Sequence, residues 1–366
     1  MNKKFLLANF LIFLVLGLGI FSIAKAQNNE GSSVNENDQA VEQMIQEDET
    51  VTAQDLGVKE PTILPDNPLY FFKNIFRRIS DAITFDPTKK LEKRLRWANE
   101  RVLELRKLAI TKKDPKILEK ASEQYQKEID QIKALADRID EKKLNDKQKA
   151  RLNDFLDKLS QQEVLHQRIL EKLQNQVPPQ VFEKIKEVRE RHLKRFGEVM
   201  NRLEKNPERL RERLERNLEK IRGSQFKDLK NLDFLKKLEE KMPPEKREAL
   251  QRLQERFQER IQKKLQQLPE IKKKQFLRYL EKTKKDPEEE LNTIQRLNLD
   301  QKLPLVKEQI LQRIQTQAQK LHKMKGCPEW TLPGPGFCEE GKIIIRRDEK
   351  GCPLPPICIS PDQIQE

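Results

Sequence analysis

Apolar residues along most of the chain recur at intervals of three and four, which is the spacing of one face of an α-helix. Capping residues and prolines divide this pattern into segments, as at Asp86-Pro87, Asn206-Pro207 and Asp286-Pro287. The pattern predicts helices over residues 69–83, 87–111, 115–140, 146–176, 179–204, 207–222, 225–241, 244–267, 270–284, 287–297 and 304–325. Because the connections are short, consecutive helices should run antiparallel. We therefore expect an all-α fold, built as an elongated antiparallel helical bundle or coiled-coil-like array.

The first two predicted helices contain the densest group of aromatic residues. They meet at Phe85-Asp86-Pro87, where Asp86 is a good N-cap and Pro87 suits the first helical position. Two helices joined in this way should pack as a hairpin. We expect its structural core to consist of Leu69, Tyr70, Phe72, Ile75, Phe76, Phe85, Asp86, Pro87 and Trp97. The alternative is that these aromatic side chains line a groove for a ligand or a peptide.

Several residues of this hairpin match the opening of a known bacterial family. They are Leu64-Pro65, Asn67-Pro68-Leu69-Tyr70, Lys73, Thr84-Phe85-Asp86-Pro87, Lys90 and the run from Trp97 to Glu104. In order and spacing they resemble the domain of unknown function 5667, with its Pro-x-x-Pro-Leu-Tyr-x-x-Lys, Thr-Phe-Asp-Pro-x-x-Lys and Ala-Glu-Arg-Arg-Leu-x-Glu motifs. The resemblance covers about residues 64–175 and departs from the motifs at Asn99 and Val102. It implies an exported or membrane-tethered helical domain with no known chemistry.

The N-terminal residues differ from this helical region in composition. Residues 1–26 combine two early lysines, an apolar run from Phe5 to Ile23 and the small-residue site Ala24-Lys25-Ala26, as a signal peptide does. The mature chain would then begin at Gln27. Because the apolar run nearly reaches the length of a membrane span, an uncleaved signal anchor is the alternative. Residues 27–60 are polar, acidic and free of aromatic residues, so we expect a disordered acidic linker.

The remaining helices fall into two regions. Residues 61–175 should form the helical domain that carries the resemblance, and residues 176–325 a charged helical region. Within the second region, segments 177–203 and 242–268 align so that apolar positions coincide. This agreement indicates a duplicated helical unit, and chance convergence of two amphipathic helices is the alternative.

All four cysteines lie in a short module rich in proline and glycine, residues 326–360. They are Cys327, Cys338, Cys352 and Cys358. In an exported protein, four closely placed cysteines indicate two disulfides, and three pairings are open. A zinc site is the alternative to disulfides, but the cysteine spacing lacks the close pairs of zinc-binding motifs. Because so small a module needs cross-links to fold, we expect a disulfide-stapled C-terminal knob.

Composition limits both the interior and the partners of the protein. Only 36% of the residues are hydrophobic and 37% are charged, so the chain cannot bury one large core. The formal net charge is +14, yet acidic and basic residues alternate along the helices as on a solvated face. An anionic envelope polymer or a membrane surface fits this charge, and nucleic acid is a poor candidate for an exported protein. Self-association through coiled-coil-like faces stays open.

The sequence contains no motif for catalysis or cofactor binding. His166, His192 and His322 lie in helical patterns without a second histidine four residues away, so we expect surface or helix-seam positions instead of metal ligation. A glycine-rich phosphate loop and a nucleophile elbow are both missing from the sequence. We therefore expect no enzyme activity, no cofactor and no bound metal.

Two functions are consistent with these features. The first is an exported, non-enzymatic helical scaffold or binding protein that associates with the cell envelope through its basic helices. The second is a secreted binder, or a protease-inhibitor-like protein, whose C-terminal disulfide knob contacts a protein partner through the rigid loop 351–358. Both place the protein outside the cytoplasm, either secreted or tethered to the membrane by an uncleaved signal anchor.

Overall fold

The computed structural model describes residues 30–111, 114–174, 176–284, 286–299, 304–334, 336–338, 341–360 and 363. Within them the chain forms twelve α-helices, one short 3-10 helix and a two-stranded antiparallel sheet. The elements are α1 (Glu30–Glu49), α2 (Tyr70–Ala82), α3 (Pro87–Thr111), α4 (Pro115–Arg138), η1 (Glu141–Lys143), α5 (Asp146–Gln174), α6 (Pro179–Leu203), α7 (Pro207–Lys220), α8 (Lys227–Glu239), α9 (Pro244–Gln267), α10 (Glu270–Thr283), α11 (Pro287–Arg296), α12 (Pro304–Lys325), β1 (Lys342–Ile344) and β2 (Ile357–Ile359). The eleven helices predicted from the sequence are all present, each with ends within two residues of the prediction.

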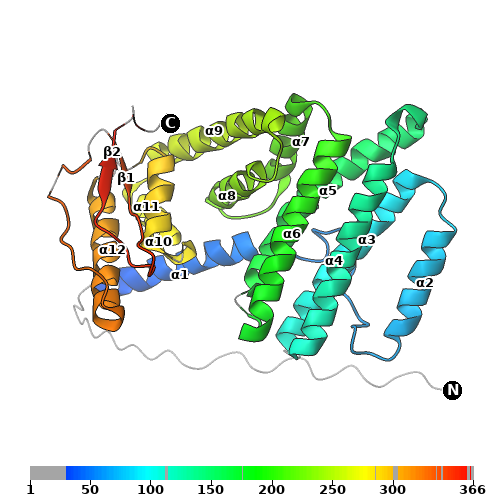
Figure 1. Cartoon of the computed structure of the whole chain (residues 1–366), viewed down its shortest axis with the longest axis horizontal. Coiled ribbons are helices and arrows are strands. Elements are labelled where there is room, and N and C mark those ends of the chain that lie inside the picture. Colours follow the sequence, from blue (N-terminus) through cyan, green and yellow to red (C-terminus); the bar gives the residue numbers. More distant parts are fainter. Residues whose placement is uncertain are drawn as a thin grey trace, which may run out of the picture.

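The helices form an elongated array, which confirms the predicted fold class (Figure 1). At one end, α3 packs on α4 and α5, and α6 packs on the same two helices, so these four close into a bundle. The rest of the array extends from this bundle: α7 packs on α5, α9 packs on α7 and α8, and α11 packs on α12. The expected duplication of segments 177–203 and 242–268 falls on α6 and α9, and it stays a prediction.

A buried chain of polar side chains joins the four helices of the bundle. Asn99 of α3 donates through Nδ2 to the carbonyl oxygen of Leu56 (2.8 Å), so its Oδ1 accepts from His166 Nε2 on α5 (2.8 Å). Burial, and then the neighbouring His192, lower the pKa of His166 well below its usual value, so the ring is neutral. Its Nδ1 therefore accepts from the hydroxyl of Tyr125 on α4 (3.0 Å).

The chain continues from Tyr125 into α6. His192 Nδ1 lies 2.6 Å from the Tyr125 hydroxyl oxygen, within hydrogen-bonding distance. On the other side of the ring, His192 Nε2 lies 2.8 Å from Glu163 Oε2 on α5. Each of these side chains is at most 2% exposed. Every helix of the bundle thus contributes at least one polar side chain to a continuous chain of contacts, and α5 contributes two, His166 and Glu163.

The prediction of a disordered linker is wrong for residues 30–60. They include the 20-residue helix α1, which packs on α10 and α5, and the buried residues Val41 and Leu56. The acidic side chains find basic partners on α10: Asp38 pairs with Arg278 (2.9 Å) and Glu42 with Lys282 (2.6 Å). Pairing with α10 removes the repulsion among the acidic side chains, on whose composition the prediction of disorder was based. The expected signal sequence and residues 27–29 lie outside the described residues.

The expected core of the opening hairpin is only partly present. Tyr70 and Trp97 are buried as predicted, whereas Ile75, Asp86 and Pro87 are half-buried. The prediction is wrong for Leu69, Phe72, Phe76 and Phe85, which are all more than half exposed. The physical reason is that α2 turns its polar side toward α3.

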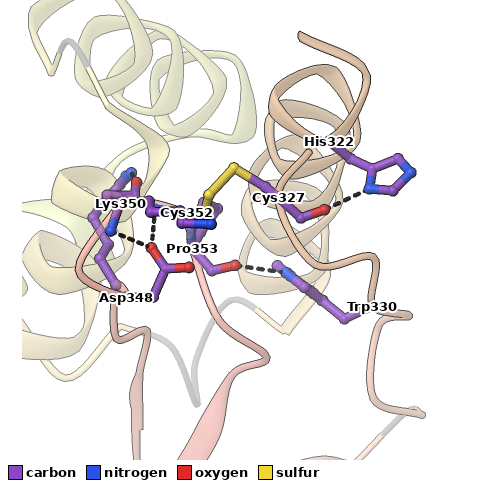
Figure 2. The surroundings of a disulfide bond; sticks show 9 residues. His322, Cys327, Trp330, Asp348, Lys350, Cys352 and Pro353 are labelled. Carbon is purple, nitrogen blue, oxygen red and sulfur yellow. Dashed lines mark hydrogen bonds between the residues drawn. A yellow bond between two sulfur atoms is a disulfide. The ribbon is translucent and has the colours of Figure 1, made fainter. Parts of the chain in front are cut away.

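The C-terminal module is stapled by two disulfides, as predicted. Cys327 is bonded to Cys352 and Cys338 to Cys358, while β1 and β2 pair as an antiparallel hairpin. Figure 2 shows the first disulfide beside Trp330, whose Nε1 donates to the carbonyl oxygen of Pro353 (3.1 Å). Two disulfides indicate an oxidising, extracytoplasmic setting.

The neutral, buried His166 predicts that acid destabilises the fold. Because the folded-state pKa lies below 6.5, the unfolded chain binds a proton more readily, so stability is present above pH 6.5 and is lost as the pH falls below it. We expect the free energy of unfolding to decrease by up to about 1.4 kcal/mol per pH unit below that point. Thermal unfolding followed by circular dichroism at pH 7.5 and pH 5.5 measures this slope.

Two variants separate the contribution of His166 from that of an exposed histidine. H166Q should flatten the pH dependence, whereas H322Q, at an exposed position on α12, should keep the wild-type slope. An undiminished slope in H166Q would contradict the assignment.

Candidate functional site

The apolar side of α2 faces solvent. Seven residues on this helix and its ends make up what we call the α2 apolar face: Leu69, Phe71, Phe72, Phe76, Ile79, Ile83 and Phe85. Their exposed fractions range from 52% to 90%, and they are seven of the ten large hydrophobic residues that are exposed in the described chain. Single exposed apolar residues are common, but a contiguous group of this size indicates an interaction surface.

The opposite side of α2 is polar and faces the bundle. Tyr70, Lys73, Asn74, Arg77 and Asp81 recur at helical spacing, and all are buried or half-buried. The periodicity in the sequence thus separates the two sides of the helix correctly. It does not say which side points inward, and here the charged side does.

A buried carboxylate on α3 anchors α2. Glu104 is fully buried and accepts hydrogen bonds from the Tyr70 hydroxyl, Lys73 Nζ (2.7 Å) and Arg101 Nη1 (3.1 Å). Arg77 of α2 lies 3.7 Å from the same carboxylate. We call these five residues the Glu104 cluster. Its burial makes each ion pair much stronger than a pair on the surface.

Further long polar side chains connect α2 to the bundle. Arg94 of α3 pairs with Asp81 (2.6 Å) and with Glu128 of α4 (2.9 Å). Lys93 donates to the Ser80 hydroxyl (2.8 Å), and Arg101 donates to Asn74 Oδ1 (2.7 Å). Figure 1 shows α2 standing apart from the neighbouring helices at the end of the array, a spacing that these long side chains bridge.

The corner between α2 and α3 is fixed by Asp86. Its carboxylate accepts from the backbone N–H of Thr88 (2.9 Å) and of Lys89 (3.3 Å), and from Arg151 of α5 (2.5 Å). Burial raises the pKa of Asp86, but a hydrogen bond from the Thr88 hydroxyl (2.7 Å), together with those from the two backbone N–H groups and Arg151, outweighs it and lowers the pKa to about 2. The capping role predicted for Asp86 is confirmed, and it leaves the adjacent Phe85 90% exposed.

Basic residues border the α2 apolar face. Arg78 is exposed on α2, Lys89 is exposed at the start of α3, and Lys90 is half-buried beside it. None of the three forms an ion pair with a described residue. The surface is therefore apolar and aromatic in its centre and positive at its edge.

The other residues considered from the sequence lie elsewhere. His166 and His192 belong to the buried chain in the bundle, and His322 is exposed on α12. The disulfide module lies at the end of the array opposite α2 (Figure 1). Sequence reasoning missed the inward polar side of α2. The sequence did contain a signal for this orientation. The cations Lys73 and Arg77 of α2 match the acids Glu100 and Glu104 of α3 in charge and spacing.

No described helix is sufficiently long and apolar to span a membrane.

Residues 62–180 match the model of a protein family described as a domain of unknown function (DUF5667). The chain thus contains this domain, as the sequence motifs indicated, and the remaining residues are unassigned. No curated protein and no solved structure matches the chain. The α2 apolar face and the Glu104 cluster both lie inside the matched region. Tyr70, Lys73, Arg101 and Glu104, which fit the family motifs, meet in the cluster.

Removing the charge of Glu104 should release α2 from the bundle. The substitution E104Q leaves the cations of the cluster without their buried partner, a loss that typically costs about 3 kcal/mol. We expect amide hydrogen exchange over residues 70–82 to accelerate at least tenfold, because α2 has few apolar contacts to retain it. Hydrogen-exchange mass spectrometry of the peptides that cover α2 makes the measurement.

The matched control is E60Q. Glu60 also pairs with an arginine, Arg106 (3.0 Å), but its side chain is 58% exposed, so a change below about 1 kcal/mol is expected. Unchanged exchange of α2 in E104Q would show that the cluster does not hold the helix.

Proposed function

We propose that this protein is an exported, non-enzymatic helical binding protein that docks on the surface of an anionic membrane through the α2 apolar face. The α2 apolar face itself is the observation that carries the proposal. The helix presents phenylalanine and isoleucine side chains to solvent while its own polar side is committed to the bundle. An amphipathic helix of this kind inserts its apolar side into the boundary between headgroups and acyl chains.

The energetics favour reversible binding. Moving an exposed phenylalanine, isoleucine or leucine from water into the interface gains about 1 kcal/mol, and the α2 apolar face has seven such residues. Each basic residue near an anionic surface adds about 1 kcal/mol, which Arg78, Lys89 and Lys90 can supply. Part of this total is offset by the loss of free motion on binding.

The position of α2 in the array also suits a flat target. The helix lies at one end of the elongated molecule, so its apolar side can meet a surface while the rest of the array extends away (Figure 1). The two disulfides and the signal-like residues 1–26 agree with a target outside the cytoplasm. If the leader stays as an anchor, the α2 apolar face would supply a second membrane contact. If the leader is removed, the α2 apolar face would supply the contact by itself.

We prefer this function over binding through the disulfide knob because the knob is engaged with the rest of the chain. Arg347 pairs with Glu288 (2.6 Å) and with Asp286 (3.3 Å), and Lys307 of α12 donates to the carbonyl oxygen of Phe337 (3.0 Å). Within the loop 351–358, Pro353 is held by Trp330.

Vesicle binding tests the proposal. The chain from Gln27 onward, which omits the apolar leader, should co-sediment with vesicles of mixed phosphatidylglycerol and phosphatidylcholine. We expect the double variant F72S/F76S to lose at least tenfold in affinity, because it removes two large side chains from the centre of the α2 apolar face. Raising the salt concentration should weaken wild-type binding without abolishing it.

The matched control is I271S/M324S, which removes two apolar side chains that are equally exposed but lie on α10 and α12. Its vesicle binding should equal that of the wild type. Absence of wild-type binding, or equal losses in both double variants, would refute the proposal. Self-association that F72S/F76S abolishes, measured by analytical ultracentrifugation without vesicles, would assign the α2 apolar face to a second copy of the chain instead.

A further inference from the structure

A cavity of about 800 Å³ lies away from α2, where the bundle meets the second half of the chain. Its walls come from α5 and α6 on one side and from α8, α10 and α11 on the other, and Lys342 of β1 reaches its edge. The volume is typical of a pocket for an organic ligand, and pockets are frequent where two structural units meet. The family model covers α5, whereas α8 to α11 lie outside it.

A buried arginine with unsatisfied hydrogen-bonding capacity lines this cavity. Arg168 of α5 is only 5% exposed. Its Nη1 donates to the carbonyl oxygen of Arg222 (3.0 Å), but Nε and Nη2 have no hydrogen-bond partner among the described residues. A buried cation without a partner is costly, which makes this side chain the main indication of a ligand.

The acid that influences Arg168 is already engaged by other groups. Asp48 of α1 accepts from the backbone N–H of Ser224 (2.6 Å), from its hydroxyl (2.8 Å) and from the hydroxyl of Tyr279 (2.6 Å). Burial lowers the pKa of the Arg168 guanidinium, and the charge of Asp48 only partly opposes that effect. The described chain places no carboxylate within 4.0 Å of Arg168.

A second group of charged residues in the cavity also has a net positive charge. The single carboxylate of Asp233 pairs with both Lys284 (2.5 Å) and Arg296 (2.9 Å). Burial raises the pKa of Asp233, but the two cations outweigh it and the pKa is lowered, so the carboxylate stays ionised. One negative charge therefore faces two positive charges.

The complete lining shows the same imbalance. It contains eight Lys or Arg residues and four Asp or Glu residues. Three of the four acids, Glu171, Glu240 and Glu289, are exposed at the edge. Lys236 and Lys237 on α8 line the cavity without an ion pair to any described residue. The floor and one edge of the cavity therefore carry a positive potential.

We propose that this cavity binds a small organic molecule that carries an oxyanion, either a phosphate or a carboxylate. The buried charge of Arg168 would balance the oxyanion, while Lys236 and Lys237 attract it at the entrance. Side chains such as Leu193, Leu229 and Phe234 provide apolar wall for the uncharged part of the ligand. The site uses no residue of the α2 apolar face, so the test of this proposal is independent of the test of membrane docking.

Binding of three related sugars to the full-length protein tests the site. Glucose 6-phosphate and glucuronate supply the phosphate and the carboxylate, and uncharged glucose is the matched probe without an oxyanion. We expect at least one charged sugar to bind in isothermal titration calorimetry and to raise the melting temperature, whereas glucose does neither. Comparing the two charged sugars identifies the preferred oxyanion.

Variants locate the binding. R168M removes the buried charge at similar volume and should weaken binding at least tenfold, and it should still fold because the lost charge has no ion-pair partner. E171Q removes a rim acid of the same cavity and should strengthen binding two- to fivefold. K158Q, an exposed substitution on the same helix outside the cavity lining, should leave binding unchanged.

The opposite results overturn the proposal. One is that neither charged sugar binds to the wild type, and another is that R168M binds as tightly as the wild type. A third is that K158Q loses as much affinity as R168M, which would indicate attraction to the overall charge of the protein. If R168M does not fold, the comparison of K236Q/K237Q with E171Q decides. Weaker binding in the first and stronger binding in the second support the site, and any other outcome refutes it.

Discussion

The fold depends on a chain of buried polar contacts that joins α3, α4, α5 and α6. It runs from Glu163 through His192, Tyr125 and His166 to Asn99, and ends at the carbonyl oxygen of Leu56. A buried polar group that loses its partner costs about 1–3 kcal/mol, so the four helices have one favourable register. Apolar packing acts beside these contacts, because the buried hydrophobic residues from Val41 to Ile343 form one continuous cluster. This overturns the expectation from composition that the chain cannot bury one large core. Helices α1, α7 and α8 pack directly on this bundle, α9 and α10 pack on those helices, and α11 and α12 follow in succession. Helix α2 is joined to α3 by ion pairs.

Buried polar groups need partners, and this requirement also explains the orientation of α2. Its apolar side would normally be buried, yet the Glu104 cluster holds the polar side inward. Glu104 could not remain buried without the cations of α2 and α3, and those cations could not remain ordered without Glu104. The consequence is an apolar surface whose position is fixed by ion pairs. Four of the residues that fit the family motifs, Tyr70, Lys73, Arg101 and Glu104, meet in this cluster, so part of the motif pattern coincides with the contacts that hold the helix.

The α2 apolar face and the cavity proposed to bind an anion occupy different parts of the helical array. The first lies at the outer end of the bundle, and the second lies where α5 meets α8, α10 and α11. Helix α1 contributes to the second region, because Asp48 orders Tyr279 and Ser224 beside Arg168. The disulfide module closes the far end and adds Lys342 to the edge of the cavity. The two proposals together describe a binding scaffold with one surface for attachment and one cavity for a small anion.

The sequence by itself determined the features that depend on neighbouring residues. Helix ends follow from local caps such as Asp86 and Asn206, the hairpin corner from Phe85-Asp86-Pro87, and the two disulfides from four clustered cysteines. The tertiary structure alone decided which side of α2 is buried, which cysteines pair, and that α1 folds. These outcomes depend on partners distant in sequence: Asp38 is neutralised by Arg278, which is 240 residues away, and Tyr70 is bound by Glu104 of the next helix. Amphipathic periodicity defines two sides of a helix, but only the charges of its neighbour decide which of them is stable in the interior.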